Sequence, residues 1–113
     1  MDAKRATVKL GFDGNHLFAE IVGEIDHFTA AGIREQIDRE MYRLHPRELV
    51  IRLDGVSFMD SSGLGLIVGR LRVAQELRTT LRVTGADRRK MQIFSMAGLE
   101  RMQGLRIEQA VHS

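Results

Sequence analysis

The 113-residue sequence contains no cysteine, no tryptophan and a single proline. Without cysteine, the chain can form neither a disulfide nor a metal site built on thiolates, which suits a reducing cytoplasm. It also lacks a continuous apolar run of the roughly 18 to 20 residues that a membrane span needs, and residues 1–7 precede no apolar run of signal-peptide length. We therefore expect a cytoplasmic protein without a membrane partner.

Aromatic residues are also few, at 5% of the chain, and neither sign of charge predominates, because the net charge is only +2. The charge is unevenly placed. Residues 1–60 carry 8 basic and 11 acidic side chains, whereas residues 61–113 carry 9 basic and 4 acidic ones. A nucleic-acid binder would show a denser basic stripe with exposed aromatic side chains. No nucleic-acid partner is therefore expected.

The four histidines do not share the spacing of a metal site; they are His16, His27, His45 and His112. A nucleophile pair of His27 and Ser61 is conceivable, but the sequence around Ser61 lacks the Gly-x-Ser-x-Gly elbow and an evident oxyanion hole. We expect no metal, no other cofactor and no catalytic activity.

Five stretches have strand patterns. The first alternates between polar and apolar residues and is joined to the second by Asp13-Gly14, a strong signal for a hairpin turn. The third is short and largely apolar, which predicts a central strand buried on both faces; its discordant residue, Arg52, is expected near an end or at a helix rim. A loop should follow over residues 54–59, with Phe58 among its anchors in the core. The five stretches are residues 7–12, 16–22, 48–53, 81–84 and 105–107.

Three stretches show helical periodicity. Thr29 is a plausible N-cap of the first, which Pro46 ends. The second covers residues 62–77. Asp87 can cap the third, which ends at Gly98, where a residue without Cβ suits a left-handed cap. The third helix carries three side chains that are expected in the core more than in a partner groove: Met91, Phe94 and Met96.

The predicted element order is β-β-α-β-α-β-α-β. Strands that alternate with helices after a hairpin imply right-handed crossovers, and so an α/β fold with a mostly parallel, mixed β-sheet and helices packed on it. Apolar residues make up 43% of the chain, which is typical of a globular protein. The length fits one domain, so residues 1–113 are expected to form a single unit.

The segment Phe58-Met59-Asp60-Ser61-Ser62-Gly63-Leu64-Gly65 is the most informative part of the sequence. It predicts a strand-to-helix loop with Ser61 as the N-cap, where unpaired N–H groups and the helix dipole would accommodate an attached anion. Gly63, Gly65 and Gly69 each lower helix propensity by roughly 1 kcal/mol relative to alanine. That cost indicates a close backbone approach, either by a partner or by a neighbouring element.

This segment resembles the phosphorylation loop of the anti-sigma factor antagonists of the STAS domain family. Three further stretches are similar to the family in order and spacing, at the end of its second strand, in its central strand and at the end of its third helix. They are Gly23-Glu24-Ile25-Asp26, Leu49-Val50-Ile51-Arg52-Leu53-Asp54 and Phe94-Ser95-Met96-Ala97-Gly98-Leu99. The similarity is closest to the sporulation sigma-F antagonists, with the general-stress branch next. Arg78-Thr79-Thr80 lacks a glycine that is frequent in the family, and Ala86-Asp87 replaces a frequent proline.

The resemblance implies a STAS-like regulator that is not an enzyme. Its unphosphorylated form would bind an anti-sigma factor with serine kinase activity and so release the sigma factor. Phosphorylation of Ser61 by that kinase would inactivate it, and a PP2C-type phosphatase would restore it. The free protein is expected to be a monomer. The predicted partner-binding residues are Asp26, Asp60, Ser62, Gly63, Leu64 and Gly65.

Other interpretations stay open. Ser61 could be an ordinary N-cap, and Ser62 is a second candidate for phosphorylation. Asp60 could take part in kinase recognition or be a plain loop acid, and Asp26 could simply bond backbone N–H groups. For the whole protein, the alternatives are a STAS scaffold subunit of a larger signalling assembly and a small serine enzyme or phosphocarrier.

Overall fold

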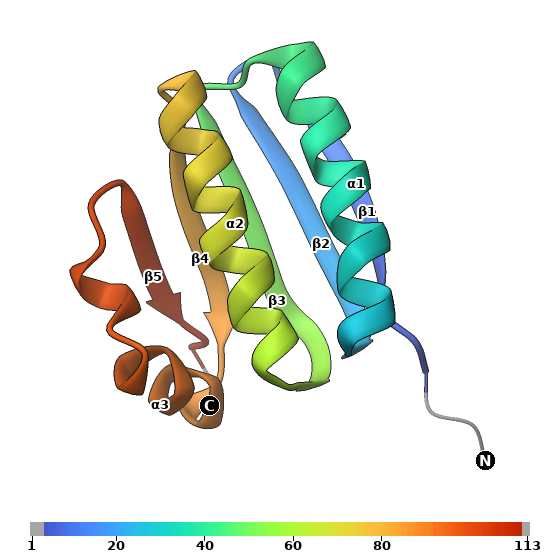
Figure 1. Ribbon diagram of the computed structural model, residues 1–113, viewed down its shortest axis with the longest axis vertical. Helices are drawn as coiled ribbons and strands as arrows, with labels where there is room; N and C mark the ends of the chain where they lie inside the picture. The colour runs from blue at the N-terminus through green and yellow to red at the C-terminus, as the bar shows by residue number, and fades with distance from the viewer. Residues whose placement is uncertain (1–3, 112–113) are drawn as a thin grey trace.

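The computed structural model describes residues 4–111. Five strands form one sheet in the order β1-β2-β3-β4-β5, in which β1 is antiparallel to β2 and the other neighbours are parallel (Figure 1). This confirms the predicted element order and the mixed, mostly parallel sheet. The elements are β1 (Thr7–Phe12), β2 (His16–Ile25), α1 (His27–Leu44), β3 (Glu48–Met59), α2 (Ser61–Leu77), β4 (Thr80–Ala86), α3 (Arg88–Met96), the 3-10 helix η1 (Leu99–Arg101) and β5 (Leu105–Gln109).

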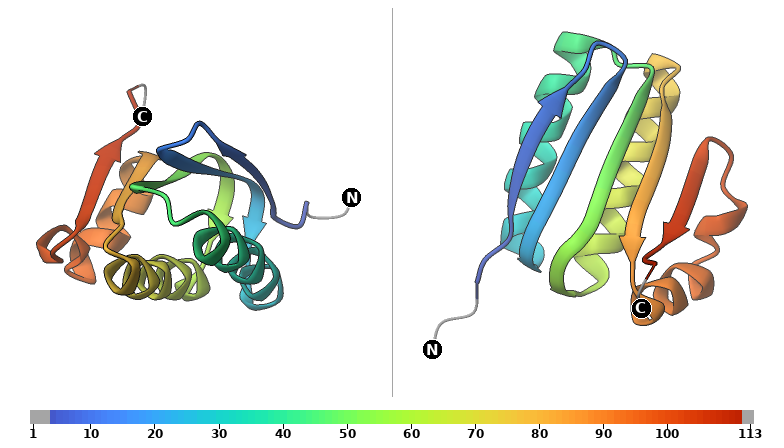
Figure 2. Two further views of the ribbon diagram at one scale, coloured as in Figure 1. Left: turned by 90° about the horizontal axis from the view of Figure 1, so that it is seen from above. Right: turned by 180° about the vertical axis from the view of Figure 1, so that it is seen from behind.

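Helices α1 and α2 lie side by side on one face of the sheet, and no described helix covers the opposite face (Figure 2). Successive side chains of a strand point to opposite faces, so those of β2 face the helices and the open side in turn. Leu17, Ala19 and Ile21 are buried beneath the helices, whereas Phe18 and Glu20 lie on the outer face. In the described part of the chain, no helix is long and apolar enough to cross a membrane.

Strand β3 is longer than the sequence predicted, because it continues through residues 54–59 where a loop was expected. Strand β2 runs beside it to its last residue, with two register shifts on the way. Gly55 permits this pairing, since a Cβ there would lie 2.9 Å from Cγ2 of Val22. The connection to α2 consequently shrinks to the single residue Asp60.

Helices cover only one face of β3, so the predicted burial on both faces holds at Val50 but not at Arg52. Leu49 and Ile51 are buried on the helix side, and Val50 is buried on the outer side. Arg52, which was expected near an end or at a helix rim, lies on the outer face. Its guanidinium carbon is 4.7 Å from the centroid of the Phe18 ring, which is a cation–π contact.

Candidate functional site

Three parallel strands end at one edge of the sheet, and an aspartate follows each of them directly. Asp26 follows β2, Asp60 follows β3 and Asp87 follows β4. Each is the N-cap of the next helix, so its carboxylate accepts hydrogen bonds from backbone N–H groups of the first turn. In open α/β sheets, ligands bind outside this carboxyl edge. A functional site is therefore expected here.

Asp60 caps α2, whereas the sequence predicted Ser61 in that role. Oδ1 of Asp60 accepts a hydrogen bond from the Ser62 N–H at 2.7 Å, and the Asp60 carbonyl accepts one from the Gly63 N–H at 2.9 Å. The carboxylate also places a negative charge at the positive end of the helix dipole, which a serine cap would not do. Ser61 is consequently the first helical residue. Its side chain is exposed, and its hydroxyl makes no hydrogen bond to another described residue.

Asp26 closes the start of α1 in a reciprocal capping box. Its Oδ1 accepts hydrogen bonds from the N–H groups of Phe28 at 3.0 Å and Thr29 at 2.9 Å, while Oγ1 of Thr29 accepts one from the Asp26 N–H at 2.9 Å. Thr29, predicted as the cap, is thus the third helical residue. The backbone hydrogen bond from Thr29 is the main cause that holds the pKa of Asp26 below its ordinary value. The Asp60 N–H donates to the Ile25 carbonyl at 3.4 Å, which ties the two capped helix starts together.

The glycines of α2 have two different roles. Gly63 is buried, and a Cβ at this position would lie 2.9 Å from Sδ of Met59, so the packing of α2 against the end of β3 requires glycine. Gly63 therefore serves the fold, and its contact with a partner stays a prediction. Gly65 is exposed, and a Cβ there would meet open space. Leu64 is half-buried against the core and Ser62 is half-buried as well, which leaves Ser61 and Gly65 as the exposed residues of this turn.

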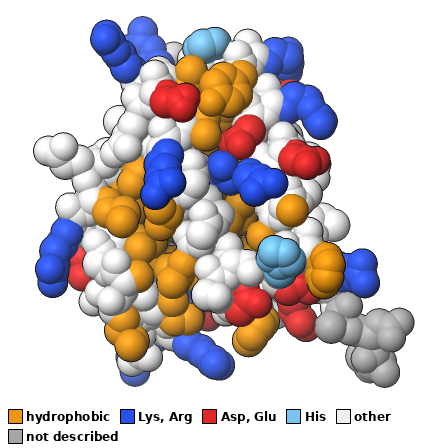
Figure 3. Space-filling view, viewed as in Figure 1, with side chains coloured by type: hydrophobic (Ala, Val, Ile, Leu, Met, Phe, Trp, Pro, Cys, Tyr) orange, Lys and Arg blue, Asp and Glu red, His pale blue; other side chains and the backbone are white. Residues whose placement is uncertain are grey.

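Exposed apolar side chains also lie near this edge, and sequence reasoning missed them. Phe28, at the start of α1, is 79% exposed, and Phe58 is 45% exposed although it was expected to anchor in the core. On α3, Phe94 is fully buried as predicted, but Met96 is exposed. Hydrophobic side chains gather over the lower left part of the helix face, around the start of α2 and α3 (Figure 3). Apolar side chains clustered beside polar ones are typical of a protein-binding surface.

A metal centre is not formed by the described residues, because no group of His, Asp and Glu side chains among them could hold an ion. His27 lines a cleft with Ser62, so it lies opposite the second serine of the loop. His112 lies outside the described residues. The carboxyl edge thus offers an exposed serine hydroxyl, capped helix starts and apolar side chains.

Comparison with known proteins gives a consistent result. The family model of the STAS domain matches residues 7–113. The chain is 32% identical over 83 residues to the anti-sigma F factor antagonist of Paenibacillus polymyxa, covering 74% of this chain and 71% of that protein. It is 34% identical over 89 residues to the anti-sigma-B factor antagonist of Listeria monocytogenes, covering 77% of this chain and 75% of that protein.

Two solved structures share the fold. The anti-sigma factor antagonist SpoIIAA in its unphosphorylated form has a TM-score of 0.79 at 22% identity, covering 94% of this chain and 90% of that chain. The Bacillus cell fate determinant SpoIIAA in the phosphorylated form has a TM-score of 0.74 at 22% identity, covering 94% of this chain and 93% of that chain. The sheet, the hairpin and the three helices described above are therefore the STAS fold.

The chain belongs to the STAS domain family and, within it, to the anti-sigma factor antagonists. The sigma-F and sigma-B antagonists are similar to it to nearly the same degree, so the expected preference for the sigma-F branch does not stand out. Anti-sigma factor antagonists are regulators and not enzymes, which agrees with the prediction that the protein catalyses no reaction.

Proposed function

We propose that the protein, while unphosphorylated, binds an anti-sigma factor that is also a serine kinase and thereby releases a sigma factor. Phosphorylation of Ser61 by that kinase ends the complex, and a PP2C-type phosphatase restores it. The observation that carries this proposal is the exposed Ser61 hydroxyl at the first position of α2, which has no hydrogen-bond partner among residues 4–111. Membership of the antagonist family supports the class of partner.

A phosphate on Ser61 suits the start of a helix. It would lie beside the N–H groups of the first turn and the positive end of the helix dipole, and that turn contains no acidic residue of its own. The carboxylates of Asp26 and Asp60 already accept backbone hydrogen bonds. The modified protein therefore keeps its fold, which is in keeping with the solution of SpoIIAA structures in both an unphosphorylated and a phosphorylated form.

The proposed partner surface combines small and polar residues with exposed apolar ones. A phosphate adds about −1.5 to −2 units of charge near neutral pH. Buried against a partner without a counter-charge, such a group costs several kcal/mol, which separates the complex. Around Ser61, the surface consists of Asp26, Phe28, Phe58, Asp60, Ser62, Leu64 and Gly65.

We also propose how the chain is organised, where the protein works and which kind of sigma factor it controls. Residues 1–113 act as one domain in the cytoplasm, monomeric when free, and control a sigma factor of the sporulation or general-stress type. Both types are supported, since antagonists of sigma-F and of sigma-B align with this chain at similar identity.

Phosphosite mapping tests the proposal. The protein is incubated with the serine-kinase anti-sigma factor of the same organism and ATP, and mass spectrometry then locates the phosphate. We expect one phosphate per chain, on Ser61, and loss of the complex as it is incorporated. Ser62→Ala is the matched control, because it removes the neighbouring hydroxyl while the Asp60 cap on the backbone N–H of residue 62 is kept. Phosphate on Ser62, or a complex that survives full phosphorylation, would refute the proposal.

A further inference from the structure

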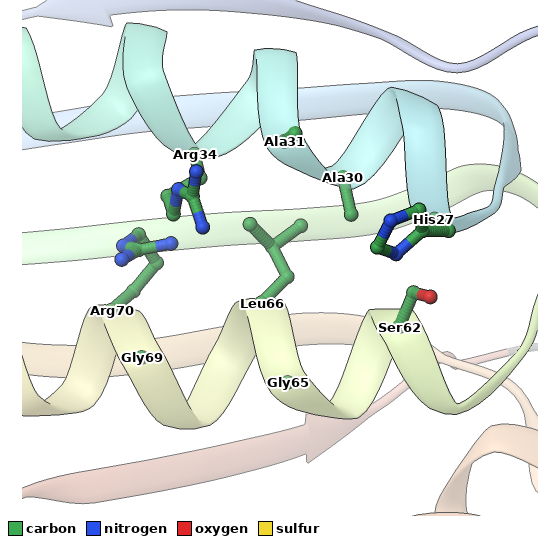
Figure 4. Close-up of a pocket in the computed structure, with 9 residues that line it drawn as sticks. All are labelled: His27, Ala30, Ala31, Arg34, Ser62, Gly65, Leu66, Gly69 and Arg70. Carbon is green, nitrogen blue, oxygen red and sulfur yellow. The ribbon is translucent and has the colours of Figure 1, made fainter.

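A cleft of about 350 Å³ lies between α1 and α2 (Figure 4). His27 and Ser62 face each other at one end of it, near the starts of the two helices, and Arg34 and Arg70 face each other at the other end. Apart from Leu66, the residues between these ends are small: Ala30, Ala31, Gly65 and Gly69. At both glycines a Cβ would meet open space, so the fold does not require the missing side chains.

Arg70 is unusual for a charged residue lining a cleft, because its side chain is almost fully buried, at only 4% exposed. Its Nε lies 2.7 Å from Oδ1 of Asp38, an ion pair by distance that lacks the geometry of a hydrogen bond. Its Nη1 is buried and has no hydrogen-bond partner among the described residues. A buried N–H group of a cation is costly when it is unpaired. Arg70 therefore carries donor capacity that Asp38 does not use.

Arg34 adds a second positive charge at the same place. Its side chain is exposed, points across the cleft toward Arg70 and forms no ion pair with another described residue. Burial is the largest cause that lowers the pKa of Arg70, and the charge of Arg34 lowers it further. Two carboxylates lie nearby: Asp38 pairs with Arg70 only, and Glu76 accepts a hydrogen bond from the Tyr42 hydroxyl. The Arg34 guanidinium at this end of the cleft is therefore left without an ion-pair partner among the described residues. A guanidinium binds carboxylates through paired N–H groups, and two of them on facing helices can share one oxyanion.

We propose that a carboxylate binds between Arg34 and Arg70, and that it belongs to an acidic side chain of the anti-sigma factor. The inference rests on the function proposed above. Two observations point to a protein as the source of the carboxylate. The cleft is continuous with the partner surface through Ser62 and Gly65. Its small residues also leave room along the helices for a segment of the partner, whose acidic side chain then reaches the arginines.

The experiment compares kinase binding and thermal unfolding of the wild type, Arg34→Gln and Arg39→Gln. Arg39 is the matched control, because it is an exposed arginine of the same helix that does not line the cleft. We expect Arg34→Gln to weaken binding by roughly 30- to 100-fold, the low end of the loss seen when one partner of a buried charge pair is truncated. Its melting temperature should not fall, because a positive charge beside Arg70 has been removed. Arg39→Gln should leave both quantities unchanged.

The outcomes separate the two proposals. If the wild type binds the kinase and Arg34→Gln binds equally well, the carboxylate site is refuted and the proposed function stands. Equal weakening by Arg34→Gln and Arg39→Gln would reveal a general effect of charge and would also refute the site. If the wild type fails to bind, the function proposed above falls, and this inference falls with it. Arg34→Lys provides a further check, since it should recover part of the affinity by restoring the charge without the paired N–H groups.

Discussion

Helices α1 and α2 start at the same edge of the sheet, and an aspartate caps each of them, yet the two starts differ. At α1, Asp26 and Thr29 satisfy one another in a closed box. At α2, the Asp60 side chain accepts a single hydrogen bond, from the Ser62 N–H, and the Ser61 hydroxyl beside it is left without a partner among the described residues. The first arrangement stabilises a helix. The second also leaves a hydroxyl accessible for modification.

Two glycines at the start of α2 show a second contrast, within one helix. Gly63 is fixed by its contact with Met59, so it belongs to the packed interior. Gly65, one residue past Leu64, faces solvent along the α1–α2 cleft. A single turn of α2 thus combines a residue that the fold requires with one that it does not require. Substitutions at the two positions should therefore separate stability from binding.

A large effect on binding is expected from filling the open side of that turn. Gly65→Leu places a bulky side chain in the proposed partner surface, where a Cβ meets no neighbour in the free protein. We expect kinase binding to weaken by roughly 10-fold or more, as for a steric clash in an interface core, with an unchanged circular dichroism spectrum. Binding is measured by calorimetry. Wild-type affinity in Gly65→Leu would place the interface elsewhere.

The next effect concerns stability and involves the buried glycine. In Gly63→Ala, the new methyl group would lie 2.9 Å from Sδ and 3.1 Å from Cβ of Met59, so α2 or Met59 must shift. We expect a loss of about 1 to 3 kcal/mol in the free energy of unfolding. Gly65→Ala is the control, and it should gain up to about 1 kcal/mol through helix propensity. Denaturant unfolding measures both, and equal effects at the two positions would contradict the assigned roles.

A smaller effect distinguishes the hydroxyl residues at the two helix starts. Thr29→Ala removes the hydroxyl that accepts from the Asp26 N–H and should cost about 0.5 to 1 kcal/mol of stability, after allowance for the better helix propensity of alanine. Ser61→Ala should cost nothing, because the Ser61 hydroxyl makes no hydrogen bond to another described residue. Thermal unfolding of the two variants side by side is the measurement. A clear loss in Ser61→Ala would mean that Ser61 has a structural role.

The smallest effect concerns acid pH. The pKa of Asp26 is lowered in the folded protein, mainly by the Thr29 N–H. Its contribution to stability is therefore fully present above the unfolded pKa of about 3.9 and is lost as the pH falls through the lower, folded value. Asp26→Asn keeps a capping oxygen but does not titrate, so its stability should fall less steeply than that of the wild type below about pH 4. Unfolding scans across this range provide the comparison, and parallel curves would contradict it.

The sequence predicted the element order correctly because alternation, helical periodicity and the Asp13-Gly14 turn are local signals. It failed where two local signals competed or where a distant neighbour decided the outcome. At both helix starts an aspartate and a hydroxyl residue could cap, and the carboxylate took the position. The extension of β3 through residues 54–59 depends on pairing with β2, which no local pattern encodes.

The candidate site was predicted in the same uneven way. The loop containing Ser61 was found from its motif, whereas the exposure of Phe28 and Phe58 became evident only from the structure. The contact between Asp38 and Arg70 joins residues of two helices, so spacing along either helix could not reveal it. The burial of Gly63 likewise depends on where Met59 ends β3.

The central claim is that phosphorylation of Ser61 changes the partner surface and leaves the fold intact. Its most direct test is to measure melting temperature and kinase affinity on the same preparations of Ser61→Asp and wild type, with Ser61→Ala as the uncharged control. We predict that Ser61→Asp melts within a few degrees of the wild type and binds the kinase at least roughly 100-fold more weakly. Ser61→Ala should bind like the wild type and resist release by ATP. An unfolded Ser61→Asp, or one that binds as tightly as the wild type, would contradict the claim.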